Sequence, residues 1–139
     1  MRRRVINRRF ISNENLASNW IAYGLREPKF SGTLPDLMQL ETTSYCNLKC
    51  SFCPHDQMTR SNGFITLELI KVILAQSDHV ALVGPNHMAE PLLHPKIGQI
   101  VAEFEDAGIS TTILTNALLL TPEMRLTLIS SGLSRDHIT

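Results

Sequence analysis

The sequence predicts an α/β fold with a parallel sheet, on two observations. Short apolar, β-branched runs alternate three times with longer amphipathic patterns of helical period, and a fourth such run begins at the end. The residues able to carry chemistry follow these runs, on loops at the carboxyl ends of the expected strands. Helical spacers of this length join parallel strands by right-handed crossovers and place helices outside the sheet, and an antiparallel sheet would not need them.

Residues 1–34 are expected to be a leading segment with a basic arm, a short amphipathic helix within residues 14–23 and a connector. Five of the 13 Lys and Arg residues lie in the first nine positions. Such a start is typical of nucleic-acid contacts, anionic surfaces or transit peptides. We interpret it as a solvated tail, so nucleic-acid binding is not expected. Residues 35–139 then form the core domain.

The first strand is expected within residues 37–43, and the helix after it within residues 67–76, with Thr66 as its N-cap. Residues 79–83 form a short apolar run before Gly84 and Pro85, which indicates a buried parallel strand.

A second helix is expected over residues 96–107, closed by Gly108, followed by a third strand over residues 109–114. Four apolar residues at helical spacing form the expected core side of this second helix: Ile97, Ile100, Val101 and Phe104. A third helix begins after Thr121, with proline at its first position and Gly132 just past its end. Residues 136–139 would start a fourth strand.

The composition fits one globular domain. The chain has 139 residues, 43% of them hydrophobic, and it contains no apolar run near the ~18 residues that a membrane-spanning helix requires. No membrane association is expected. A cytoplasmic, reducing location fits three cysteines that have no partners elsewhere in the chain.

All three cysteines lie in one eight-residue stretch just past the first expected strand: Cys46, Cys50 and Cys53. An odd number of crowded thiols disfavours a disulfide framework, and soft thiolates favour iron–sulfur clusters or zinc. Structural zinc takes four ligands, and His55 is the nearby residue that would complete such a set. An iron–sulfur cluster held by three thiolates leaves one iron open to a further ligand.

The segment 41–54 resembles the cluster loop of the radical S-adenosylmethionine (SAM) superfamily, including the aromatic residue before the last cysteine. This resemblance implies the N-terminal half of a partial (β/α)6 barrel similar to a TIM barrel, with about three and a half βα units. It also implies a [4Fe-4S] cluster held by Cys46, Cys50 and Cys53. The open iron of the cluster would bind SAM, and Phe52 would pack near the adenine.

Two further segments resemble elements of the same family. The stretch from Met88 to Pro95 resembles its Gly-Glu-Pro element, with Ala89 in place of glycine, and implies that Glu90 binds the SAM ammonium group. Residues 115–117 resemble its Thr-Asn-Gly turn, again with alanine at the glycine position, and imply that Thr115 and Asn116 face SAM. A simple turn role for Asn116 is the alternative. The loop histidines His55, His87 and His94 are interpreted as polar loop residues rather than as catalytic acids or bases.

By this resemblance the chain is a radical SAM enzyme or its N-terminal part. It would receive an electron from a flavodoxin-type or ferredoxin-type protein and cleave SAM to a 5′-deoxyadenosyl radical, which abstracts hydrogen from a substrate that the sequence does not specify. The fourth to sixth βα units of the family lie beyond the matched part. The alternative is a truncated, catalytically silent chain that binds a cluster or zinc and needs a partner to complete the barrel.

Overall fold

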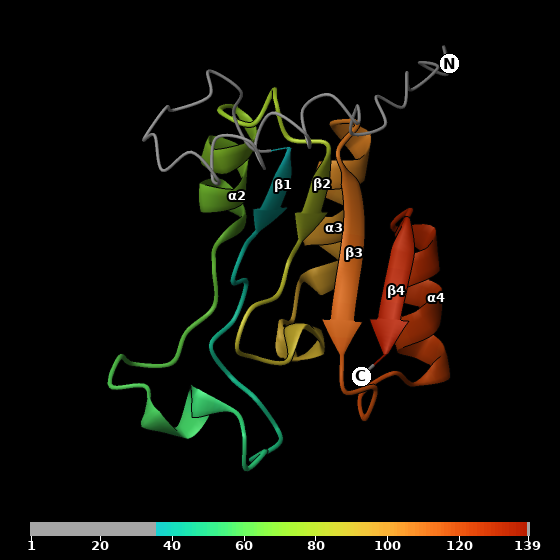
Figure 1. Cartoon of the computed structure of the whole chain (residues 1–139). Coiled ribbons are helices and arrows are strands. Elements are labelled where there is room, and N and C mark those ends of the chain that lie inside the picture. The colour runs from blue at the N-terminus through green and yellow to red at the C-terminus, as the bar shows by residue number, and fades with distance from the viewer. Residues whose placement is uncertain (1–35, 139) are drawn as a thin grey trace, which may run out of the picture. The chain divides into compact units, whose positions relative to one another are not determined.

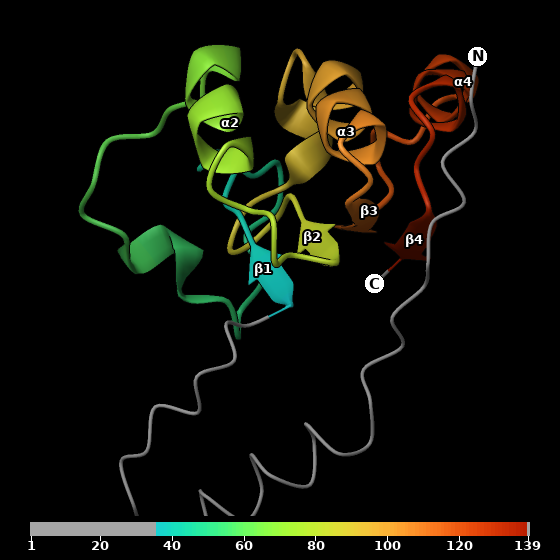
Figure 2. The ribbon, with the colours of Figure 1, turned by 90° about the horizontal axis from the view of Figure 1, so that it is seen from above.

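The computed structural model describes residues 36–138, which form a parallel sheet covered by helices on one face (Figure 1, Figure 2). The strands are β1 (Leu37–Gln39), β2 (Leu82–Gly84), β3 (Ser110–Thr115) and β4 (Arg135–Ile138), and they lie side by side in sequence order. Each neighbouring pair is parallel. The predicted α/β fold with parallel strands is therefore confirmed.

The crossover helices are α2 (Leu67–Leu74), α3 (Ile97–Asp106) and α4 (Pro122–Ser130). Two of them begin as the sequence predicts, because the hydroxyl oxygen of Thr66 accepts from Leu69 N and that of Thr121 accepts from Met124 N. Seen along the sheet, all three helices cover the same face of the strands (Figure 2). Two short 3-10 helices, η1 (Pro54–Gln57) and η2 (Pro91–Leu93), lie in the loops after β1 and β2.

Helix α3 contributes to both halves of the hydrophobic core. Its residues Ile100 and Phe104 pack with Ile70 of α2 and Val83 of β2. A second cluster joins its other side to β3 and α4, through Ile97, Val101, Ile113, Leu128 and Leu92 of η2. The four apolar residues predicted as the core side of this helix are all buried. Burial of apolar surface on both sides fixes the central helix against the sheet.

Glu105, near the end of α3, links the amino ends of two strands. Its carboxylate accepts hydrogen bonds from the backbone and hydroxyl groups of Thr111 in β3 and of Ser134, the residue before β4.

Two helices end at a glycine in the left-handed conformation. Gly108 after α3 and Gly132 after α4 have φ of +82° and +84°, in the region that favours glycine.

The strands β3 and β4 lie within one residue of their predicted bounds, and β1 and β2 differ by more. β1 ends at Gln39 rather than near residue 43, because the chain continues as a separate antiparallel bridge between Thr43 and Phe64. β2 begins at Leu82 rather than at residue 79, because Val80 N donates to Ser77 O and so extends the turn after α2. The arm, helix and connector predicted for residues 1–34 lie outside the described residues, so that division of the chain stays a prediction. Within residues 36–138, no helix has the length and apolar character needed to cross a membrane.

Candidate functional site

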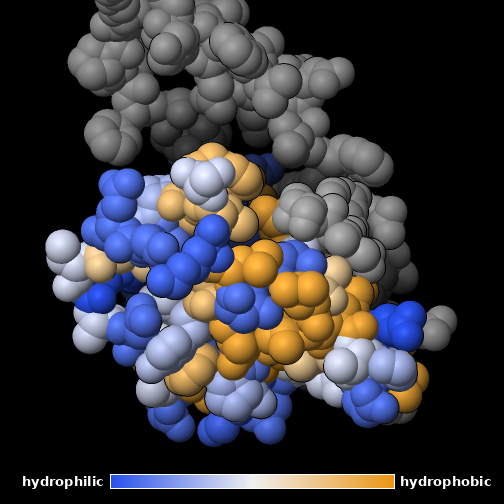
Figure 3. Space-filling view, turned by 90° about the horizontal axis from the view of Figure 1, so that it is seen from below, coloured by the Kyte–Doolittle hydropathy of each residue, from blue (hydrophilic) through white to orange (hydrophobic). Residues whose placement is uncertain are grey.

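Three loops meet at the carboxyl ends of the strands. They follow β1, β2 and β3, and they contain every site residue that the sequence predicts except Thr115, which is the last residue of β3. Parallel strands bring such loops to one edge of a sheet, where α/β folds hold their ligands. Viewed from this end, the molecule shows apolar surface beside polar side chains (Figure 3). Met88 and Leu118, in the loops after β2 and β3, are among its exposed apolar residues.

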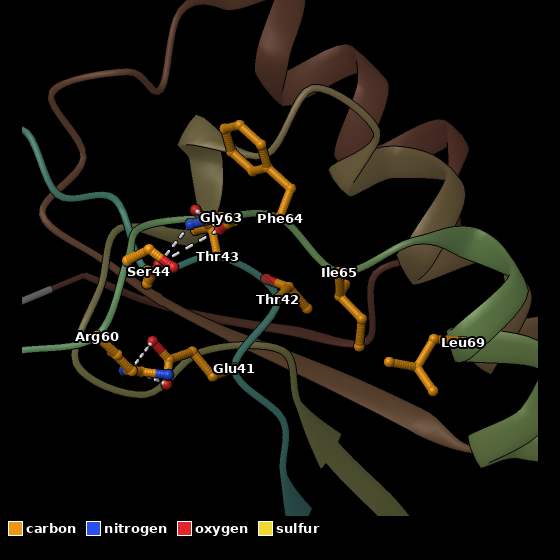
Figure 4. A pocket seen from close by; sticks show the side chains of 10 residues that line it. Glu41, Thr42, Thr43, Ser44, Arg60, Gly63, Phe64, Ile65 and Leu69 are labelled. Carbon is orange, nitrogen blue, oxygen red and sulfur yellow. Dashed lines mark hydrogen bonds and ion pairs between the residues drawn. The ribbon is translucent and has the colours of Figure 1, made fainter.

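The loop that carries the cysteines is fastened at its base. Ser44 N donates to Gly63 O at 3.1 Å and Ile65 N donates to Thr42 O at 2.9 Å, while Gly63 N donates to the Ser44 hydroxyl at 2.8 Å. These bonds make a short antiparallel ladder that brings the two ends of the loop together. An open pocket of about 280 Å³ lies beside the ladder (Figure 4).

An ion pair closes the same base. Arg60 donates from one guanidinium nitrogen to both carboxylate oxygens of Glu41, at 2.5 and 2.6 Å. The Glu41 side chain is 17% exposed and the Arg60 side chain 54% exposed, so the pair lies at the rim of the pocket rather than in the core (Figure 4). The chain between these fastenings therefore leaves the sheet and returns to it as one closed loop.

The three cysteines are free thiols on this loop. Cys46 and Cys53 are half-buried, Cys50 is exposed, and Cys53 N donates to Cys50 O in a tight turn. Across residues 36–138, no three Cys, His, Asp or Glu side chains are gathered to hold one metal ion. The donor set itself, three thiols on one loop with none in a disulfide, fits a thiolate-bound iron–sulfur cluster. Phe52, between the second and third cysteines, is 89% exposed.

His55, the residue that would complete a zinc site, is held by the loop instead. Its Nε2 lies 2.9 Å from Ser44 O, and its Nδ1 lies 3.8 Å from an oxygen of Asp56. The ring is mostly buried, at 14% exposure. The contact of Nε2 with Ser44 O fixes one side of the ring at the base of the cysteine loop, and the buried Nδ1 has no hydrogen-bond partner among the described residues.

Glu90 is the centre of the site. Only 2% of this residue is exposed, and its carboxylate accepts three hydrogen bonds. Oε1 accepts from Leu92 N at 3.0 Å and from the Thr115 hydroxyl at 2.7 Å, and Oε2 accepts from Asn116 N at 2.9 Å. Its backbone N donates to Tyr45 O at 3.0 Å. One residue of the β2 loop thus binds the loops after β1 and β3.

The turn after β3 is built on side-chain hydrogen bonds. The Thr115 hydroxyl accepts from Ala117 N at 3.0 Å, and Asn116 Oδ1 accepts from Leu118 N, also at 3.0 Å. Ala117 has φ of +61°, and it is the one described residue other than glycine with a positive φ. Of the two alanines at expected glycine positions, Ala117 therefore occupies the strained conformation and Ala89 does not.

His94 and Asn47 contribute contacts that the sequence analysis did not assign. His94 is 2% exposed, its Nδ1 accepts from Lys96 N at 3.0 Å, and its Nε2 lies 3.0 Å from Ile65 O. It therefore ties the β2 loop to the segment that closes the cysteine loop. Asn47 accepts a hydrogen bond from Asn116 across the site. The local sequence around His94 and Asn47 contains no pattern that would predict these hydrogen bonds to residues distant in the chain.

Comparison with known proteins identifies the family. The family model described as the radical SAM superfamily matches residues 40–139. The chain belongs to the radical SAM superfamily. Members of this superfamily use a [4Fe-4S] cluster and SAM, in agreement with the donor set on the loop after β1.

Named radical SAM relatives differ in what they do. The chain is 34% identical over 111 residues to the AdoMet-dependent heme synthase of Methanosarcina barkeri, covering 76% of this chain and 31% of that protein. It is 31% identical over 90 residues to the tungsten-containing aldehyde ferredoxin oxidoreductase cofactor-modifying protein of Pyrococcus furiosus, covering 63% of this chain and 25% of that protein. The chain thus spans about a quarter to a third of the length of these relatives.

Solved structures of other proteins share the fold. BtrN in complex with AdoMet and 2-DOIA superposes with a TM-score of 0.69 at 24% identity, over 76% of this chain and 45% of that one. Streptococcus suis SuiB bound to S-adenosylmethionine gives a TM-score of 0.53 at 24% identity, over 71% of this chain and 21% of that one. The likeness confirms a partial α/β barrel similar to a TIM barrel.

Proposed function

We propose that this chain holds a [4Fe-4S] cluster on Cys46, Cys50 and Cys53 and binds SAM at the carboxyl ends of β1, β2 and β3. When bound, the cluster would supply the electron that cleaves SAM to methionine and a 5′-deoxyadenosyl radical, which abstracts hydrogen from a substrate. The observation that carries the proposal is the buried residue Glu90, whose carboxylate accepts from Thr115 and Asn116 and whose backbone N donates to Tyr45 O, next to Cys46.

The charge of Glu90 favours a cationic ligand. Among the described residues no Lys or Arg forms an ion pair with it, although its carboxylate is almost fully buried. A carboxylate has about four acceptor positions, and three are used within the chain, which leaves one on Oε2. An ammonium group placed there would satisfy that position and compensate a buried charge. The ammonium group of SAM has this chemistry.

The other predicted contacts have distinct roles in this proposal. Thr115 and Asn116 orient the Glu90 carboxylate by donating to it, so that they act on SAM through Glu90. Phe52 is exposed at the tip of the cysteine loop and would cover the adenine once the loop closes around the cluster. The apolar surface at this end of the sheet would receive the uncharged parts of the ligand (Figure 3).

The proposal also covers the electron donor, the location and the substrate of the whole enzyme. A flavodoxin-type or ferredoxin-type protein would deliver the electron, and a cytoplasmic location is expected. Named relatives are described as a heme synthase, a peptide cyclase and a GTP cyclase, so no single substrate is proposed. The alternative proposal is a catalytically silent chain that binds an iron–sulfur cluster or zinc and needs a partner to complete the barrel.

Anaerobic reconstitution with iron and sulfide tests the proposal. The wild-type chain should bind about four irons and, after reduction with dithionite, convert SAM to 5′-deoxyadenosine and methionine. Cys50→Ser should lose both properties, because it removes a thiolate ligand, whereas the neighbouring change Ser51→Ala should keep them. Iron binding without SAM cleavage would favour the cluster-binding alternative. Zinc in place of iron would overturn the cluster assignment.

A further inference from the structure

One side-chain hydrogen bond joins the first part of the cysteine loop to the turn after β3. Asn116 Nδ2 donates to Asn47 Oδ1 at 2.9 Å, across 69 positions of the sequence. Asn47 directly follows Cys46. The bond therefore connects the backbone beside the first cysteine to the strand-end loop whose backbone also binds Glu90.

The orientation of this bond is fixed by its neighbours. Asn116 Oδ1 accepts from Leu118 N at 3.0 Å, so the amide nitrogen of Asn116 must face Asn47. Asn116 N is itself held by Glu90 Oε2. Asn116 is thus a preorganised donor, and Asn47 needs only to present an acceptor oxygen.

The contact differs from the other fastenings of the cysteine loop. The ladder formed by residues 42–44 and 63–65 and the Arg60–Glu41 pair lie at the base of the loop. Tyr45, which accepts from Glu90 N, is one residue before Cys46. Beyond that point Cys50 and Phe52 are exposed, and the Asn47 amide is the contact that reaches another strand-end loop.

We propose that Asn47 is a positioning residue that holds Cys46 at a set distance from the Glu90 pocket by accepting from Asn116. The inference rests on the proposed function, since it gives Cys46 the role of a cluster ligand. This bond couples the conformation of the SAM-binding loops to that of the cysteine loop. Binding of SAM therefore favours the cysteine conformation that binds the cluster, and binding of the cluster favours SAM binding.

The donor and acceptor chemistry gives a specific set of variants. Asn47→Asp keeps an acceptor for the Asn116 amide. Asn116→Asp keeps the acceptor for Leu118 N, and Asn47 can turn its amide to donate to the new carboxylate. The double variant has two facing carboxylates and no donor, so it loses the bond and adds repulsion. Asn62→Asp, in the exposed part of the same connection, is the control for added charge.

Two readouts test the proposal, one of them without any cofactor. In the chain free of iron, the rate at which iodoacetamide alkylates Cys46 is measured by peptide mass spectrometry. Each single variant should alkylate at nearly the wild-type rate, and the double variant about ten-fold faster, a coupling of about 1.4 kcal/mol. In the reconstituted chain, the SAM concentration that half-converts the cluster signal should rise about ten-fold more in the double variant than the two single changes together account for.

The outcomes separate the two proposals. If the effects of the two single changes simply add in the alkylation rate, or if Asn62→Asp has the effect of the double variant, the positioning role of Asn47 is refuted. If the wild-type chain assembles no cluster but the alkylation rates are coupled, the link between the loops stands and the proposed function fails.

Discussion

Ala117 shows how a single backbone conformation can be tested. Its φ of +61° places a Cβ in the left-handed region, at a position where the related family turn has glycine. An L-residue costs roughly 1–2 kcal/mol there. Ala89 stands at the other expected glycine position without a positive φ. The two alanines are therefore a matched pair with opposite backbone demands.

Glycine at these two positions should have opposite effects on stability. Ala117→Gly should raise the free energy of unfolding by about 0.5–1 kcal/mol, because relief of strain exceeds the added entropy of the unfolded chain. Ala89→Gly should lower it by about 0.4–1 kcal/mol, because only the entropy term remains. Urea denaturation of the chain free of iron measures both. Destabilisation by Ala117→Gly would show that the turn does not hold this residue in the left-handed region.

At the scale of the elements, α3 and α4 approach each other at Gly98. A Cβ on Gly98 would lie 2.6 Å from Thr127 Cγ2 and 3.0 Å from Ser131 Oγ. Thr127 is β-branched and its methyl group cannot move aside easily. The absence of a side chain at Gly98 is therefore what lets the two helices pack at this distance.

Gly98→Ala should lower the free energy of unfolding by about 1–2 kcal/mol, because steric overlap outweighs the better helix propensity of alanine. Thr127→Ser removes the methyl group and keeps the hydroxyl that donates to Glu123 O. The double variant should therefore recover most of the loss, a coupling that thermal denaturation of the four proteins would reveal. Equal losses with and without Thr127→Ser would contradict the close approach.

The sequence predicted the elements better than their contacts. The helical spacing of apolar residues and the capping residues predicted the bounds of α2, α3 and α4 to within about two residues. Capping residues act on the adjacent helix end, so the sequence alone reveals their effect, as it does here for Thr66, Thr121, Gly108 and Gly132. The bounds of β1 and β2 were less accurate, because an isolated bridge and a turn compete for the same residues. Parallel strands depend on partners distant in the chain, which a local pattern does not specify.

At the scale of the whole molecule, the site is a meeting of three loops from far apart in the sequence. The cysteines and Glu90 were predicted from their motifs, and the structure places Glu90 between the loops after β1 and β3. The bonds from His94 to Ile65 and from Asn116 to Asn47 were not predicted, because common polar residues show no pattern until the fold brings them together.

Two glutamates, Glu90 and Glu105, form hydrogen bonds at opposite ends of the sheet. Glu90 binds the loops at the carboxyl ends of the strands, and Glu105 binds the amino ends of β3 and β4. Both are bonded by backbone and hydroxyl donors. Only Glu90 lies at the end of the sheet where the cysteines are, so changes at these two carboxylates separate ligand binding from general stability.

The most direct test is electron paramagnetic resonance of the reduced, reconstituted chain with and without SAM. The wild-type protein should give a [4Fe-4S] signal that changes when SAM is added. Glu90→Gln should keep the signal but need about 10–100-fold more SAM for the same change, because a charge-assisted hydrogen bond is lost. Glu105→Gln should respond to SAM as the wild type does. A wild-type signal indifferent to SAM, or an unchanged response in Glu90→Gln, would contradict a SAM site built around Glu90.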